Sequence, residues 1–212
     1  MRIATTLDSE TSKNTLQNSN NQSVQDFDNT FFGLLFNYRV TNNDVFSNDK
    51  FNLTINPSFG KRESENLNNN QFKIDIEASY LWEFNSRNSI FIRNKTGYLN
   101  SDSFIDNELY RIGGANSIRG FNEQSIFTSQ FSFLNIEYRY LTSRNSYLYT
   151  ISDLGRIKTQ NLNNENIYGL GLGYLFSINN SQINLGYVIG KSSSSNFDFE
   201  QSKLIISLIT FF

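Results

Sequence analysis

Residues 71–84 read QFKIDIEASYLWEF and show the clearest β-strand pattern in the chain. Apolar side chains recur at every second position, and polar or charged side chains fill the positions between them, with Leu81 as the interruption. Side chains of a strand point alternately to its two faces, so this period of two predicts a strand with one apolar and one polar face. The segment indicates an all-β fold.

The same alternation recurs along the chain in stretches of about ten residues, the length that a tilted strand needs to cross a bilayer. A chain of 212 residues fits one all-β domain, so we predict a single domain over residues 1–212. The ten predicted strands cover approximately residues 2–8, 32–40, 51–59, 71–84, 90–99, 134–140, 147–156, 168–176, 182–189 and 203–212.

The predicted connections alternate in length from the fourth strand onward. Outer-membrane β-barrels show this asymmetry, with short periplasmic turns and longer external loops, and an even number of strands places both chain ends on the periplasmic side. Tight turns are predicted at 85–88, 142–145 and 179–181, and longer polar loops at 101–129, 158–166 and 192–201.

A soluble, lipocalin-like barrel would give a similar alternation with its apolar face inward. The strand length, the aromatic residues near strand ends and the charged residues on the opposite faces favour an antiparallel transmembrane β-barrel. The predicted partner of its outer face is membrane lipid.

Composition excludes several classes of function. The chain has no cysteine and no histidine, which excludes thiolate or imidazole metal sites, cysteine nucleophiles and histidine-dependent triads. The net charge is -2 and the charges are dispersed, so no nucleic-acid partner is predicted. We expect no catalytic residue, no metal and no cofactor, and therefore no enzyme activity.

Two segment types are not predicted. The chain contains no apolar run of the length that a transmembrane helix requires. Its first ten residues, MRIATTLDSE, lack the charged and apolar regions of a signal peptide, so we expect a mature form or a fragment.

The rarest string in the chain is YRIGGANSIRGF, which covers residues 110–121 of the long loop 101–129. Gly113, Gly114 and Gly120 allow the loop to turn sharply and to approach other backbone closely. Arg119 carries a charge that needs a partner, unless it is an ordinary exposed loop arginine. For Gly113 and Gly114, an ordinary turn and a special role are both open.

Residues 118–121, IRGF, resemble the V/I-R-G-F/Y string of outer-membrane assembly barrels and two-partner-secretion transporters, the BamA/TamA-like or bacterial surface antigen superfamily. The next strand in that family carries E-Y-R, which residues 137–139 match. The strand after it carries F-x-D-x-G, which residues 151–155 match with Ile151 in place of the aromatic. The likeness covers about residues 109–212, and upstream it is limited to general barrel patterning.

The resemblance implies a set of site residues. The loop folds into the barrel lumen, where its arginine meets acidic residues of the two following strands and braces the barrel. The terminal aromatic residue is the signal that assembly machinery recognises. The residues implied are Ile118, Arg119, Gly120 and Phe121 in the loop motif, Glu137 and Asp153 as arginine partners, Gly155 and Tyr138 as motif-strand support, and Phe212 as the C-terminal assembly signal.

The turn between the two acidic strands decides whether this contact is possible. A three-residue turn at 143–145 places Glu137 and Asp153 on the same face, one diagonal step apart, whereas a four-residue turn places them on opposite faces. One guanidinium could bridge both carboxylates in the first case. We interpret Arg139 as ordinary lumen lining, and Gly169, Gly171 and Gly173 as space for the inserted loop.

The implied function is that of an integral protein of the bacterial outer membrane that assembles or translocates other proteins. Its implied partners are client outer-membrane or secreted proteins and the assembly machinery. The alternatives are a passive pore or structural barrel and the barrel portion of a larger fused protein.

The chain departs from the family in size. Family barrels have sixteen strands, usually preceded by periplasmic docking domains, whereas we predict ten strands and no docking domain here. The preferred interpretation is the C-terminal part of a sixteen-stranded barrel, with a split or degenerate gene product and a reduced barrel as alternatives. An open sheet would need the missing strands or a second copy to pair its edges in lipid.

Overall fold

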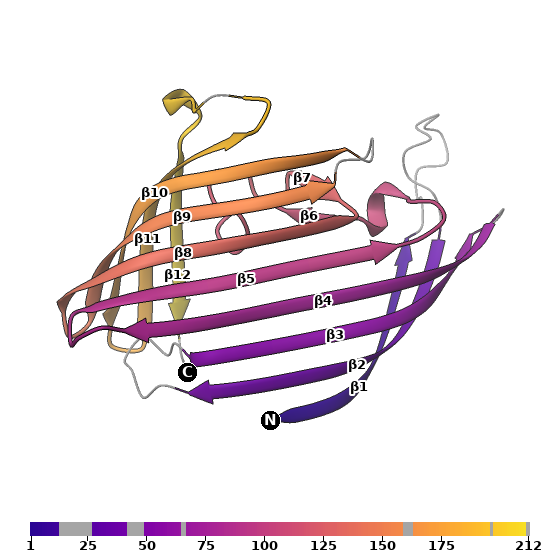
Figure 1. Cartoon of the computed structure of the whole chain (residues 1–212), viewed down its shortest axis with the longest axis horizontal. Helices are drawn as coiled ribbons and strands as arrows, with labels where there is room; N and C mark the ends of the chain where they lie inside the picture. Colours follow the sequence, from indigo (N-terminus) through magenta and orange to yellow (C-terminus); the bar gives the residue numbers. More distant parts are fainter. Residues whose placement is uncertain (13–26, 42–48, 65–66, 159–162, 196, 211–212) are drawn as a thin grey trace.

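The computed structural model describes residues 1–12, 27–41, 49–64, 67–158, 163–195 and 197–210, which form an all-β fold (Figure 1). Ten strands make one antiparallel sheet and two short strands make a separate hairpin, so the all-β prediction is confirmed. Phe212 lies outside the described residues. The sheet strands are β1 (Arg2–Ser12), β2 (Phe27–Thr41), β3 (Asp49–Ser64), β4 (Leu67–Glu83), β5 (Asn88–Asn100), β8 (Gln130–Ser143), β9 (Ser146–Lys158), β10 (Asn164–Ile178), β11 (Ser181–Ser192) and β12 (Lys203–Thr210).

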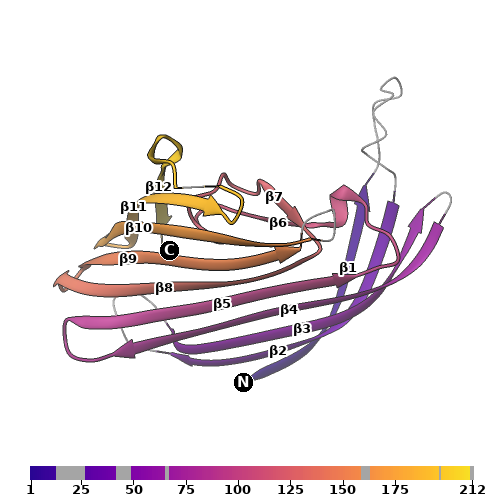
Figure 2. The ribbon, with the colours of Figure 1, turned by 45° about the horizontal axis from the view of Figure 1, so that its top comes forward.

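The order of strands in the sheet follows the chain, with β8 next to β5 because the hairpin of β6 (Tyr110–Ile112) and β7 (Ile126–Thr128) lies outside the sheet. Within the described residues, β1 pairs only with β2 and β12 only with β11, so the sheet has two edges. The sheet curves strongly, and β12 passes behind β8 and β9 (Figure 1). Turned by 45°, it has the form of a trough (Figure 2).

Helical structure in the described residues is limited to two 3₁₀ turns, η1 (Asp106–Glu108) and η2 (Phe199–Gln201). Neither could cross a membrane, since both are far too short.

Most strands are longer than the predicted ten residues, and β3 and β4 contain 16 and 17. In these two strands the extra length is mostly polar. Lys61, Arg62 and Glu63 of β3 pair with residues 68–70 of β4 beyond the alternating apolar stretch. In β3 and β4 the alternation therefore marked the part of the strand with an apolar face, while backbone pairing continues into the polar ends. In β8 and β9 the added residues include the buried Phe131, Phe133 and Ile157.

The convex face of the sheet is apolar and exposed. Leu172 and Leu204 are 66% and 69% exposed. Apolar side chains also lie next to each other across strands, since Phe32 of β2 faces both Leu7 of β1 and Phe59 of β3. Other exposed apolar residues of this face are Ile3, Leu34, Tyr80, Trp82, Tyr138, Tyr140, Leu148, Leu154, Leu170, Leu185, Tyr187, Ile206 and Leu208.

The concave face differs between the two halves of the sheet. In β1–β5 it is mostly polar, with the buried Phe31, Leu81 and Leu99 among the polar side chains. For example, Asn37 of β2 donates hydrogen bonds to Asn52 and Thr54 of β3. In β8–β12 it is packed with apolar side chains, including a buried cluster of Tyr147, Tyr149, Ile151 and Val188. The middle of the long loop between β5 and β8 lies against this second half, and its beginning contacts β3 and β4.

Gly173 of β10 supports the apolar cluster by its lack of a side chain. A Cβ at this position would overlap the ring of Tyr149, whereas a Cβ at its cross-strand partner Gly186 would have no neighbour closer than 3.5 Å. The Tyr149 hydroxyl is held by a 2.7 Å hydrogen bond to Asn184. The ring therefore has little freedom to move away.

This pair of glycines provides a test of the packing. We expect Gly173→Ala to lower the free energy of unfolding by about 1 to 3 kcal/mol because it overpacks the site. Gly186→Ala, the matched control, should be neutral or should stabilise by about 0.5 to 1 kcal/mol, as removal of a strand glycine does. Urea unfolding in detergent micelles, followed by Trp82 fluorescence, measures both; equal effects would contradict the packing described.

Candidate functional site

The candidate site is the loop 101–129, which leaves β5, forms η1 and the β6–β7 hairpin, and lies on the concave face of the sheet (Figure 2). Gly113 and Gly114 have φ angles of +109° and +99°, in the left-handed region that favours glycine. A Cβ at Gly113 would also overlap the carbonyl oxygen of Asn122. Both glycines are thus needed for the turn that carries the chain from β6 toward Arg119.

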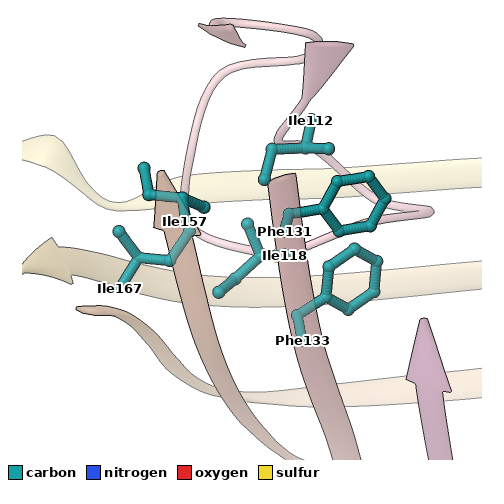
Figure 3. Packing of buried hydrophobic residues seen from close by; sticks show 6 residues of the cluster. All are labelled: Ile112, Ile118, Phe131, Phe133, Ile157 and Ile167. Atoms are coloured by element: carbon teal, nitrogen blue, oxygen red, sulfur yellow. The ribbon is translucent and has the colours of Figure 1, made fainter. Parts of the chain in front are cut away.

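Ile118 anchors the loop through apolar packing. Its side chain is completely buried between the strands and the hairpin, and Figure 3 shows it among the other members of its cluster. Gly155 of β9 leaves the space for it, because a Cβ there would lie 2.8 Å from the Ile118 Cδ1. The cluster consists of Ile112, Ile118, Phe131, Phe133, Ile157 and Ile167, with Tyr110, Phe121 and Ile126 packed against it.

Backbone packs directly on backbone at the next two loop residues. Gly120 has a φ of +93° and rests on Gly190 of β11, since a Cβ at Gly120 would lie 2.6 Å from the Gly190 nitrogen. A Cβ at Gly169 of β10 would overlap the carbonyl oxygen of Arg119. Gly169 and Gly190 are cross-strand partners, so they form one flat surface under the loop.

The prediction that Gly169, Gly171 and Gly173 all make room for the loop is correct only for Gly169. Gly171 lies against the backbone of Tyr187 in the neighbouring strand, and Gly173 lies under a tyrosine ring. The loop runs across the strands instead of along β10. The other glycine that it contacts is therefore Gly190 of β11.

Arg119 is 6% exposed and donates to two carboxylates. Its Nε and Nη2 donate to Asp153 Oδ2 and Oδ1 at 2.9 and 2.6 Å, and its Nη1 donates to Glu137 Oε1 at 2.5 Å. The backbone N–H of Arg119 also donates to Asp153 Oδ2, at 2.8 Å. Asp153 therefore accepts three hydrogen bonds from one loop residue and is fully buried. We call Arg119, Asp153 and Glu137 the arginine clamp.

The register of β8 and β9 makes the clamp possible. Asn135 faces Asp153 and Arg139 faces Tyr149, so Glu137 and Asp153 share the concave face one diagonal step apart. This is the register of the predicted three-residue turn. The turn itself differs from the prediction, because strand pairing continues to Ser143 and Ser146. The register shifts between Leu141 and Ser143.

Arg139 is not the ordinary lumen-lining residue that the sequence suggested. It is buried, and its Nε and Nη2 donate to Glu137 Oε2 at 2.9 and 2.7 Å. Its guanidinium also lies 4.3 Å from the ring centre of Phe91 and 5.0 Å from that of Tyr147. Arg139 and Glu137 are two positions apart and therefore share one face of the strand. This spacing could have indicated that they form a pair.

Tyr138 has a different place from the one that its motif position suggested. It points to the convex face and donates a 2.6 Å hydrogen bond to Asn88. It therefore does not contact the loop, because consecutive residues of a strand face opposite sides.

Asn135 and Arg93 extend the contact surface of the loop and were not predicted. Asn135 donates to the Ser117 carbonyl oxygen at 3.0 Å, and Arg93 donates to that of Asn116 at 3.2 Å. Arg93 also donates to Asn135 Oδ1 at 2.9 and 3.0 Å. These two residues hold the loop backbone just before Ile118 from β5 and β8.

The electrostatics of the clamp are balanced. Arg119 and Arg139 offset the charges of Glu137 and Asp153 within one buried network. Burial by itself lowers the pKa of Arg119, but its hydrogen bonds to Asp153 and the charge of Glu137 outweigh burial and raise the pKa above its ordinary value. The guanidinium stays charged at any accessible pH. No group of three metal-binding side chains occurs among the described residues.

A second buried ion pair fastens the beginning of the loop to the other half of the sheet. Arg62 of β3 is 1% exposed, and its Nη1 donates to Glu108 Oε1 at 2.8 Å. Glu108 also accepts from Gln71 Nε2 of β4 at 2.9 Å and from the Ile105 backbone N–H at 3.0 Å. Arg62 Nη2 donates to Ser103 Oγ at 2.6 Å. We call Arg62, Gln71 and Glu108 the second anchor.

No family model matches the sequence, and no curated protein matches it. The likeness to the BamA/TamA-like proteins therefore rests on the motif residues themselves.

Removal of the clamp arginine should be strongly destabilising. Arg119→Ala leaves two buried carboxylates with fewer partners, and we expect a loss of about 3 to 5 kcal/mol in the free energy of unfolding. The control is Arg111→Ala in the same loop, because Arg111 is exposed and its guanidinium contacts only the ring of Phe127 among the interactions described, so the change should be at most about 1 kcal/mol. Urea unfolding in detergent measures both variants. A similarly small loss of unfolding free energy in both variants would show that the buried contacts do not hold the loop.

Loss of the second anchor should release the start of the loop locally. Glu108→Gln removes the charge that compensates Arg62, so trypsin cleavage after the loop residue Arg111 should accelerate, by about tenfold for each 1.4 kcal/mol of local stability lost. Asp102→Asn is the control, because Asp102 is exposed in the same segment. Combining Arg62→Met with Glu108→Leu should restore part of the protection, because no unpaired charge remains while the Gln71 amide and the Ile105 N–H lose an acceptor. Unchanged cleavage in Glu108→Gln would contradict the anchor.

Proposed function

We propose that the chain forms part of the wall of a bacterial outer-membrane β-barrel that assembles or translocates other proteins, with the loop motif bracing its interior. The observation that carries the proposal is the arginine clamp. Arg119 of the IRGF string binds the glutamate of the E-Y-R string and the aspartate of the following strand. This is the set of contacts that resemblance to the BamA/TamA-like proteins implies.

The distribution of apolar surface supports a lipid partner. Apolar side chains are exposed on the convex face of the strands at both ends of the sheet and between them, including Ile3 of β1 and Leu208 of β12. A soluble protein rarely exposes so large a contiguous apolar surface. A lipocalin-like barrel would carry its apolar residues on the concave face, where β1–β5 carry mostly polar ones.

Membrane insertion requires a partner for both edges of the sheet. Unpaired backbone N–H and C=O groups are not tolerated in hydrocarbon, so β1 and β12 must each gain a neighbouring strand. We propose further strands that complete a sixteen-stranded barrel; closure of the ten strands on themselves and pairing with a second copy are the competing arrangements.

The bracing role involves no bond-breaking step. Both carboxylates of the clamp are occupied by arginine, which suits a fixed structural contact better than proton transfer. A passive pore is the second candidate, and the polar concave face of β1–β5 favours it. The assembly role and the passive pore predict different observations, because a pore conducts ions without affecting the assembly of other membrane proteins.

The first experiment expresses the chain with an added export signal and compares outer-membrane extracts on a gel with and without boiling. A heat-modifiable, protease-resistant band is expected if the strands form a barrel wall; its monomer or dimer size identifies self-closure or pairing of two copies. No resistant band from this chain, together with a resistant band after co-expression of candidate upstream strands, identifies the larger barrel. No resistant band in either case would reject the membrane barrel.

Ion conductance in planar bilayers, combined with outer-membrane protein levels after depletion of the protein, separates the two functions. Loss of other outer-membrane or secreted proteins is expected for the assembly or translocation role. Conductance with unchanged levels of these proteins would favour the passive pore.

A further inference from the structure

The charged residues on the convex face of β8–β11 are unevenly distributed. Outward positions of these four strands carry three charged side chains, Arg156, Lys158 and Lys191. All three are basic, and all three lie at the end of the sheet where the long loops connect the strands. At the opposite end, where the tight turns are, the outward positions carry Tyr138, Tyr140, Tyr174, Phe176 and Ile178.

The three basic residues lie next to the apolar band. Leu154 of β9 faces Tyr168 of β10, which faces Lys191 of β11, so one row across the sheet changes from apolar to basic. Arg156 and Lys158 follow Leu154 on the same face of β9, facing Asn166 and Asn164. Leu154 in this row is 47% exposed, and Leu170 and Leu172, which follow Tyr168 toward the tight-turn end of β10, are 45% and 66% exposed.

Aromatic rings orient Lys191 at this level. Its Nζ lies 5.7 Å from the ring centre of Tyr168 and 5.0 Å from that of Phe197. Such contacts attract an ammonium group but leave its N–H donors available to an anion. Tyrosine beside lysine is also the combination expected where a protein surface crosses from hydrocarbon to headgroups.

Neighbouring carboxylates have other roles. Glu165 belongs to the opposite face of β10 by its register with Ile157, and it accepts a 2.9 Å hydrogen bond from Ser194. Asp198 accepts from the Glu200 backbone N–H and from Gln201 Nε2 at the start of η2. By contrast, the outward Lys61 of β3 is paired with Glu63 at 3.0 Å.

We propose that Arg156, Lys158 and Lys191 form a basic rim that binds the phosphate groups of anionic lipid headgroups on the long-loop side of the membrane. Basic residues near a membrane surface are attracted to anionic lipid. The rim thus adds a lipid preference, and a fixed depth in the membrane, to the proposed barrel wall, and it rests on that proposed function.

Brominated lipids test the rim through tryptophan quenching. The chain has one tryptophan, Trp82, which is exposed on the convex face near the tight-turn end of β4 and reports on lipid away from the rim. The substitution Tyr168→Trp in a Trp82→Phe background provides a rim reporter at position 168. Each protein is folded into phosphatidylcholine vesicles containing equal fractions of brominated phosphatidylcholine or brominated phosphatidylglycerol.

We expect the rim reporter to show about fivefold stronger association with the brominated phosphatidylglycerol, and Trp82 to show none of this preference. The triple variant R156Q/K158Q/K191Q, made in the rim-reporter protein, should lose the preference. The control K61Q/R87Q/R144Q removes the same number of charges from other exposed positions and should keep it.

The outcomes separate the two proposals. Equal quenching of the rim reporter by the two brominated lipids, or a preference that survives in the triple variant, would overturn the rim while leaving the membrane barrel intact. Absence of quenching of both Trp82 and the rim reporter by either lipid would reject membrane insertion and the rim with it.

Discussion

The interior of this protein depends on the burial of one guanidinium. Arg119 could not be placed among apolar strands without carboxylates, because an unpaired buried charge is strongly unfavourable. Asp153 and Glu137 meet this need together, and the backbone N–H of the same loop residue adds a further bond. The contact constrains both sides: the loop must enter the concave face, and β8 and β9 must keep the register that places the two acids diagonally.

The glycines around the clamp follow from the same constraint. Arg119 can reach its partners only if the loop backbone lies directly on the sheet, which requires positions without Cβ atoms on both surfaces. Gly120 meets Gly190, and the carbonyl group of Arg119 lies over Gly169. Ile118 then fills the remaining space beside Gly155. Charge pairing and close packing thus reinforce each other at one location.

The loop connects parts of the sheet that are far apart. Its beginning is held by Arg62 of β3 through Glu108, and its middle is held by Asp153 of β9. Strands β4, β5 and β8 separate these two attachment points in the sheet. A loop with two buried attachments resists bending of the sheet between them, which is what the proposed bracing role requires.

Sequence alternation by itself determined the existence and order of the ten sheet strands, their two faces and the approximate positions of the turns, because a period of two is local and independent of the rest of the chain. It did not determine how far each strand extends. The motif also indicated Arg119 and two acidic partners. Only the tertiary structure decided which residues of distant strands meet. Arg62 and Glu108 are 46 residues apart and share no motif. Gly190, instead of the predicted Gly171 and Gly173, lies under the loop together with Gly169, because the loop crosses the strands. Such contacts depend on strand register and loop direction, which local periodicity does not encode.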